Sequence, residues 1–177
     1  MNKTIFGCIL AGFVAVSTMF ISCNEVSNTS NMSELDGTWV GVTGSFTETY
    51  IIDVDNSTFA CDGNYEGNNL VVSFVGDDYG YMYFVYTKAC EYAYSDPEDD
   101  SWTEVSSYGY WYRYSDSAPD CGKWYAVAFK NFDGESIDLS GAYKYDGVTS
   151  CDSLDEAMTE FTIDNGYFSY YSSVSKQ

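Results

Sequence analysis

Residues 70–94 read LVVSFVGDDYGYMYFVYTKACEYAY, which is two β-forming runs on either side of a Gly-Asp-Asp turn. Val, Tyr and Phe dominate both runs, and these residue types are enriched in strands. In the second run Tyr81 and Tyr83 alternate with Met82 and Phe84. The stretch therefore predicts an antiparallel hairpin with two aromatic faces, as expected where one face fills a barrel and the other is exposed or covered.

Short β-forming runs separated by Gly, Asp and Asn continue on both sides of this hairpin. The expected strands are Thr38–Val42, Thr47–Val54, Thr58–Asp62, Leu70–Val75, Tyr81–Tyr94, Thr103–Tyr114, Lys123–Lys130, Ser136–Tyr145 and a last one at Tyr167–Tyr171. No spacing is typical of βαβ units, and an open meander would expose its edges. The pattern favours an all-β fold, an antiparallel up-and-down meander that closes into a small barrel. A two-sheet β-sandwich is the alternative.

One helix is expected, close to the C-terminus. Ser153 and Glu156 have the spacing of a capping box, and Leu154, Ala157 and Phe161 recur at helical intervals. The tail that follows is expected to fray.

The first 23 residues have the charge and hydropathy pattern of an export signal. Lys3 precedes an apolar run at 5–21, and Ser22 stands directly before Cys23. This arrangement resembles a bacterial lipoprotein signal peptide. The resemblance implies that residues 1–22 are removed, that Cys23 is lipidated, and that the protein is held to a membrane of the cell envelope, at the outer membrane or cell surface rather than the inner membrane. An uncleaved anchor or a plain secretory peptide is the alternative.

The rest of the chain divides into a tether and one domain. Residues 23–34 are polar and lack apolar periodicity, which predicts a flexible tether. Residues 35–177 have the length of a single domain. The sequence carries 27 acidic and 7 basic residues, a net charge of −20. Such a chain is repelled by nucleic acid, whose binding depends on clustered Lys and Arg.

Four cysteines remain once Cys8 and Cys23 are set aside, and an even number in an exported chain favours disulfides. A hairpin around residues 77–78 would place Cys90 level with the turn just beyond Cys61. A hairpin around residues 133–134 would place Cys121 level with residue 146, and Cys151 follows shortly after. We therefore predict the pairs Cys61–Cys90 and Cys121–Cys151.

Gly37-Thr38-Trp39 opens the first expected strand, ahead of the meander and the C-terminal helix. A Gly-x-Trp at this place resembles the lipocalin-like (calycin) family of β-barrels. The resemblance implies a cationic residue near the end of the last barrel strand, packed against the tryptophan, and Lys144 is the candidate. An ordinary core position is the alternative for Trp39.

Tyrosine is unusually frequent, with 18 residues. Within Thr103–Tyr114, alternation places Tyr108, Tyr110 and Tyr112 on one face. Tyrosine combines a large apolar ring with a hydrogen-bonding tip, which suits binding surfaces. These three residues and the nearby Arg113 are the candidate ligand-binding residues, although strand-forming core aromatics and a surface charge are the plainer interpretation.

Catalysis has few candidate residues. The chain has no histidine, so it lacks an imidazole base, and the scattered carboxylates single out no catalytic pair. We expect no enzyme activity, no cofactor and no metal site. The sequence favours a lipid-anchored module that binds a small apolar or aromatic ligand or a surface partner. The alternative is a structural or adhesive envelope protein with a filled barrel.

Overall fold

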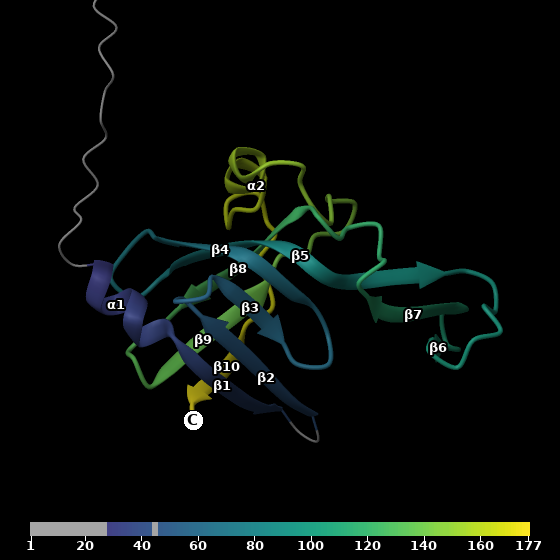
Figure 1. Ribbon diagram of the computed structural model, residues 1–177, viewed down its shortest axis with the longest axis horizontal. Helices are drawn as coiled ribbons and strands as arrows, with labels where there is room; N and C mark the ends of the chain where they lie inside the picture. The colour runs from purple at the N-terminus through teal and green to yellow at the C-terminus, as the bar shows by residue number, and fades with distance from the viewer. Residues whose placement is uncertain (1–27, 44–45) are drawn as a thin grey trace, which may run out of the picture.

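The computed structural model describes residues 28–43 and 46–177, which form ten strands and two short helices (Figure 1). In chain order these are α1 (Asn28–Leu35), β1 (Gly37–Thr43), β2 (Phe46–Asp53), β3 (Thr58–Cys61), β4 (Glu66–Phe74), β5 (Gly80–Ala93), β6 (Thr103–Val105), β7 (Tyr110–Ser115), β8 (Trp124–Lys130), β9 (Ser136–Gly141), α2 (Leu154–Glu160) and β10 (Ser172–Lys176).

Eight of the strands close into an antiparallel barrel. Their order is β1, β2, β3, β4, β5, β8, β9, β10, and β10 pairs back onto β1, where Trp39 faces Lys176. The pairing of β4 with β5 joins the two ends of the sheet. Each strand therefore neighbours the next one of the barrel along the chain. The predicted up-and-down barrel is confirmed, and the sandwich alternative is wrong.

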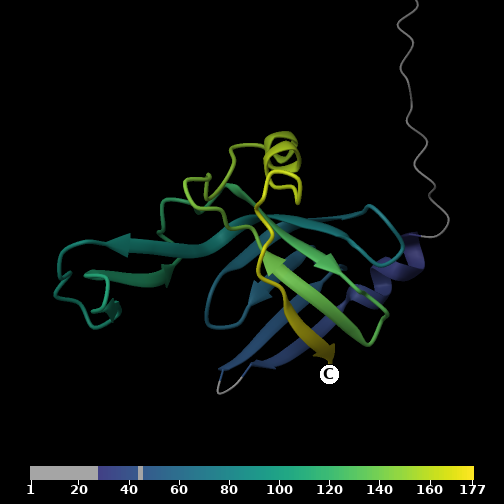
Figure 2. The same cartoon turned by 180° about the vertical axis from the view of Figure 1, so that it is seen from behind.

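Strand β5 is 14 residues long and takes part both in the barrel and in a ribbon that extends beyond it. Its first half, Gly80–Val85, pairs with β8, and β4 lies on its other side. Its second half, Ala89–Ala93, pairs with β7, which in turn pairs with β6. We call residues 89–115 the arm, because this three-stranded ribbon projects from the barrel (Figures 1 and 2).

The prediction of one long strand over Thr103–Tyr114 is wrong. A turn interrupts it, with the Tyr108 amide donating to the carbonyl of Val105 at 3.0 Å and Gly109 at φ +68°. Glycine adopts that backbone conformation without strain, so the chain reverses there and forms β6 and β7.

Aromatic rings fill the barrel interior. Phe59 and Phe84 stack with ring centroids 4.8 Å apart, and both are fully buried. Gly67 makes this packing possible, because a Cβ at that position would lie 2.2 Å from the Phe84 ring. The middle of the barrel is therefore a packed core rather than a channel.

Helix α1 lies at one end of the barrel, which we call the closed end (Figure 1). Leu35 is fully buried there, and its carbonyl accepts a hydrogen bond from the Trp39 indole at 2.9 Å. Phe132 packs edge-on against Trp39, with 6.1 Å between ring centroids. The tether predicted as coil is thus helical from Asn28 onward, because Leu35 has an apolar site in which to dock.

The C-terminal tail is ordered as β10, and the expectations of fraying and of a last strand at Tyr167–Tyr171 are both wrong. Val174 is buried at 2% exposure between β9 and β1, so the barrel is completed by residues beyond the aromatic run. The predicted helix cap is present, since the Ser153 hydroxyl accepts a hydrogen bond from the Glu156 amide at 3.2 Å.

Lys176, rather than the predicted Lys144, lies against Trp39. Its ammonium group is 5.3 Å from the Trp39 ring centroid and donates to the Glu34 carbonyl at 2.7 Å. Lys144 lies instead over the ring of Tyr167, at 5.4 Å. The correction follows from β10, which is the true last strand of the barrel.

Candidate functional site

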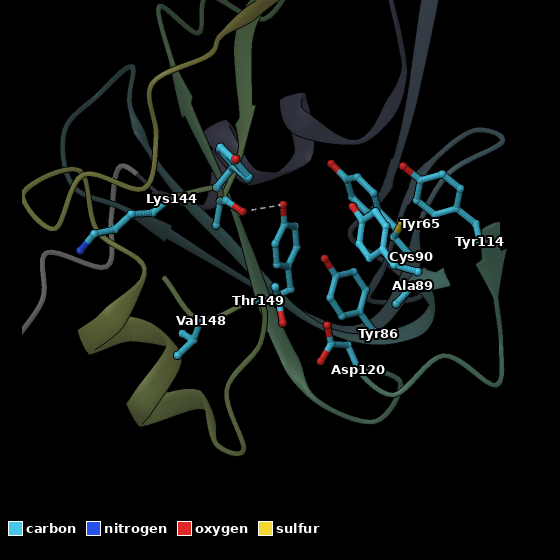
Figure 3. A pocket seen from close by; sticks show the side chains of 13 residues that line it. Tyr65, Tyr86, Ala89, Cys90, Tyr114, Asp120, Lys144, Val148 and Thr149 are labelled. Atoms are coloured by element: carbon cyan, nitrogen blue, oxygen red, sulfur yellow. Dashed lines mark hydrogen bonds between the residues drawn. The ribbon is translucent and has the colours of Figure 1, made fainter. Parts of the chain in front are cut away.

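A pocket of about 300 Å³ lies at the end of the barrel opposite α1, which we call the mouth (Figure 3). The turn between β3 and β4 provides Tyr65, and β5 provides Tyr86 and Cys90. The arm adds Tyr114 from β7, and the segment after β9 adds residues 142–144, 148 and 149. Segments far apart in sequence therefore converge on one concave site in which six of the 13 lining residues are tyrosine.

Three tyrosines form the floor of the pocket. The rings of Tyr86 and Tyr125 stack at 4.7 Å, and Tyr65 meets Tyr125 edge-on at 5.6 Å. The Tyr125 hydroxyl donates to the Ala142 carbonyl at 3.1 Å. Gly141 leaves room for this hydroxyl, because a Cβ there would lie 2.7 Å from it. The rings are therefore held in fixed orientations by packing and by a hydrogen bond.

The phenols of the pocket stay protonated at neutral pH. Burial raises the pKa of Tyr65 and of Tyr86 well above the usual value near 10, and burial likewise raises that of Tyr125. Burial raises the pKa of Tyr114 to about 12. A phenolate in this place would lose its hydration, so the walls offer neutral rings and hydroxyl groups.

The loop after β9 is fixed to the barrel at several points. The backbones of Cys151 and Trp124 exchange hydrogen bonds at 2.9 and 2.8 Å. The Ser150 hydroxyl donates to Asp120 Oδ1 at 2.7 Å, and the Tyr167 hydroxyl accepts from the Val148 amide at 2.9 Å. This wall of the pocket is thus built into the fold.

The predicted binding residues are distributed along the arm and are not gathered in the pocket. Tyr108 lies in the turn before β7 and is 79% exposed, and it stacks on Tyr110 at 6.2 Å. Tyr112 meets Tyr114 edge-on at 6.1 Å, but only Tyr114 reaches the pocket. The structure therefore links the expected tyrosine row to the pocket through Tyr114.

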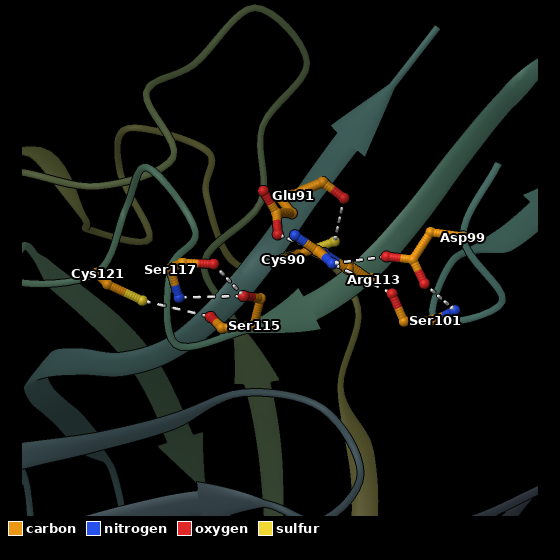
Figure 4. A network of polar contacts seen from close by, with 8 residues as sticks. All are labelled: Cys90, Glu91, Asp99, Ser101, Arg113, Ser115, Ser117 and Cys121. Carbon is orange, nitrogen blue, oxygen red and sulfur yellow. Dashed lines mark hydrogen bonds and ion pairs between the residues drawn. The ribbon is translucent and has the colours of Figure 1, made fainter. Parts of the chain in front are cut away.

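Arg113 points to the other face of the arm, where it joins β5, β7 and the loop before β6 (Figure 4). Its Nε donates to Glu91 Oε1 at 2.6 Å, and Nη1 lies 3.5 Å from Asp99 Oδ2. The guanidinium also lies 4.5 Å from the Trp102 ring centroid. Through these contacts Arg113 stabilises the arm, and it does not line the mouth pocket.

Tyr65, Tyr86, Tyr92 and Tyr125 also line the pocket and were not among the candidates. Tyr86 and Tyr92 lie in the expected aromatic strand Tyr81–Tyr94, but the sequence does not indicate which end of that strand borders a pocket. Tyr65 lies in a turn, where sequence alone gives no indication of burial.

The four cysteines of the domain carry free thiols in the structure. Burial raises the pKa of the Cys90 thiol, which donates to the Glu91 carbonyl at 4.0 Å. The two hairpins have the expected registers within two residues, since Gly67 faces Tyr86 and Val127 faces Gly141. The pairs Cys61–Cys90 and Cys121–Cys151 stay predictions.

Cys23 and the signal segment lie outside the described residues. Within residues 28–43 and 46–177, no helix is long and apolar enough to cross a membrane. Over the same residues, no three acidic or cysteine side chains cluster closely enough to hold a metal ion. Comparisons with protein-family models, with curated proteins and with solved structures found no match.

Proposed function

We propose that this protein is a lipid-anchored cell-envelope barrel that binds a small apolar or aromatic ligand at its mouth, without catalysing a reaction on it. The observation that carries the proposal is the tyrosine-lined pocket of about 300 Å³. Small-molecule sites have volumes from about 300 Å³ upward and often lie in the mouths of β-barrels. The filled interior limits the ligand to this end.

Two features support the resemblance to lipocalin-like barrels. The barrel strands follow one another in chain order, with a helix before the last strand. Lys176 on that last strand lies over Trp39, the tryptophan of the Gly-x-Trp. We therefore propose membership of this family. In such a barrel Trp39 packs the closed end, and the opposite end is available to a ligand.

Helix α1, which follows the proposed anchor in the chain, and the pocket lie at opposite ends of the barrel. Cys23 precedes Asn28, the start of α1, by five residues, and an extended chain of that length spans at most about 18 Å. A lipid on Cys23 would therefore hold the closed end near the membrane, at the outer membrane or cell surface, and the mouth would point away from it. Labelling with radioactive palmitate, lost in Cys23→Ser, tests the anchor.

Ligand binding is tested with N-phenyl-1-naphthylamine, an uncharged probe whose fluorescence rises in apolar surroundings. We expect saturable binding to the native protein. Val148→Trp places a ring at the pocket wall from a half-exposed loop position, and it should weaken binding at least about tenfold. Val42→Trp, at an exposed site on β1, is the matched control and should bind as the native protein does. Equal affinity of both variants would contradict the pocket as the site.

The arm supports a second candidate, adhesion to a surface partner. Tyr94 and Tyr108 are 82% and 79% exposed at its end, and the barrel interior is filled. In this case Tyr94→Ser with Tyr108→Ser would abolish binding of the protein to cells and leave the naphthylamine affinity unchanged. Unchanged cell binding would exclude this role for the arm.

A further inference from the structure

The mouth pocket surrounds its space with electron-rich rings. Tyr86 and Tyr125 stack on one another, Tyr65 stands edge-on to both, and Tyr92 and Tyr114 enter from the arm. The face of an aromatic ring carries partial negative charge, and several such faces around one space attract a cation. Because these phenols are neutral, this attraction comes from the rings and hydroxyl oxygens and not from phenolates.

The pocket also contains a carboxylate. Asp120 lies in the turn before β8, next to Tyr86, and Figure 3 places it at the rim of the ring cluster. The Ser150 hydroxyl donates to its Oδ1 at 2.7 Å and so holds the carboxylate in position. A cationic group in the pocket would have this carboxylate as its counter-ion.

Lys144 borders the pocket, but its ammonium group points away from the tyrosine cluster. The ammonium group of Lys144 lies 5.4 Å from the ring centroid of Tyr167, and in Figure 3 the side chain extends away from the tyrosine cluster. The chain as a whole has a net charge of −20, which concentrates cations at its surface and repels anions. The carboxylate in the pocket and the net charge of the chain therefore both favour a positively charged ligand.

We propose that the pocket selects organic cations, namely amines or quaternary ammonium compounds with a short apolar or aromatic body. The inference rests on the proposed binding function of the pocket and adds the charge of the ligand to it. The rings bind the apolar body and the cationic head, and Asp120 pairs with the head.

Three probes with one aromatic body test this selectivity. At neutral pH 2-phenylethylamine is a cation, 2-phenylethanol is neutral and phenylacetate is an anion. Each is titrated into the native protein by calorimetry and in competition with N-phenyl-1-naphthylamine. We expect the amine to bind at least about tenfold more tightly than the alcohol, and phenylacetate to bind more weakly than both.

The carboxylate is tested with Asp120→Asn, which keeps an oxygen to accept the Ser150 hydrogen bond. The amine should lose about tenfold in affinity, while the alcohol and the naphthylamine keep theirs. Asp116→Asn, at an exposed position in the same turn region, removes an equal charge and should leave all affinities unchanged.

The outcomes separate the two proposals. Equal affinity of amine and alcohol, with naphthylamine binding intact, would overturn cation selectivity and leave the ligand pocket standing. An equal loss in Asp116→Asn would assign the effect to net charge and overturn the role of Asp120. Absence of binding by the naphthylamine and all three probes would overturn the proposed function as well.

Discussion

Lys176 joins the last barrel strand to α1 by a hydrogen bond and to β1 by a cation–π contact. Its ammonium group donates to the Glu34 carbonyl at the C-terminal end of the helix and lies over the Trp39 ring. A cation at a helix C-terminus is favoured by the helix dipole, and each contact contributes about 1 kcal/mol. Lys176 thus links α1, β1 and β10 at the closed end of the barrel.

Replacing Lys176 with Met should lower the free energy of unfolding by about 1–2 kcal/mol, because both contacts are lost while the apolar stem is kept. Urea denaturation followed by tryptophan fluorescence measures this change. Lys88→Met is the matched control, since its ion pair with Glu66 is exposed and should contribute at most about 0.5 kcal/mol. Equal losses in the two variants would assign Lys176 no special role.

Single residues were predictable where the rule is local. The Ser153 cap depends on four consecutive residues, and the structure contains it as expected. The partner of Trp39 depends on which strand is last in the barrel, which no short motif specifies. Lys144 was therefore a wrong choice, although the expectation of a cation against Trp39 was confirmed with Lys176.

At the scale of elements, β5 joins a barrel strand and an arm strand in one continuous segment. Residues Gly80–Val85 lie between β4 and β8, whereas Ala89–Ala93 have β7 on one side, and β7 is followed by the three-residue β6. We therefore expect the inner half to open only with the barrel and the outer half to open when the arm separates.

Amide hydrogen exchange should therefore differ within this one strand. We expect the amides of Met82–Val85 to exchange at the rate set by global unfolding and those of Ala89–Ala93 at least about a hundredfold faster, since their opening exposes much less apolar surface. Mass spectrometry of overlapping peptides can resolve the two halves. Equal protection along the whole strand would mean that arm and barrel form one cooperative unit.

Elements were predictable where apolar alternation is strong. The registers of both hairpins follow from their turns, and the aromatic strands were located within a few residues. Strand β10 was missed because four of its five residues are polar and only Val174 faces the core. Helix α1 was missed because, among residues 31–35, only Leu35 is fully buried, which gives no apolar periodicity. The turn between β6 and β7 was missed because it lies within a run of tyrosines.

At the scale of the molecule, buried phenols couple the fold to alkaline pH. Burial raises the pKa of Tyr83 and of Tyr114 to about 12, and that of Tyr65 and Tyr86 well above the usual value. In the unfolded chain these groups ionise near pH 10. Below that pH both states are protonated and the contribution to stability is fully present.

Above pH 10 the unfolded chain loses these protons first, so the free energy of unfolding should fall as pH rises toward 12. Each fully shifted tyrosine contributes a slope of about 1.4 kcal/mol per pH unit. Phenolate absorbance and circular dichroism should be recorded together over this range. The phenols of Tyr65, Tyr83, Tyr86 and Tyr114, whose pKa values burial raises, should ionise only as the β signal is lost. Ionisation of all 18 tyrosines in one step near pH 10, with an unchanged β signal, would contradict a barrel filled and lined by protonated rings.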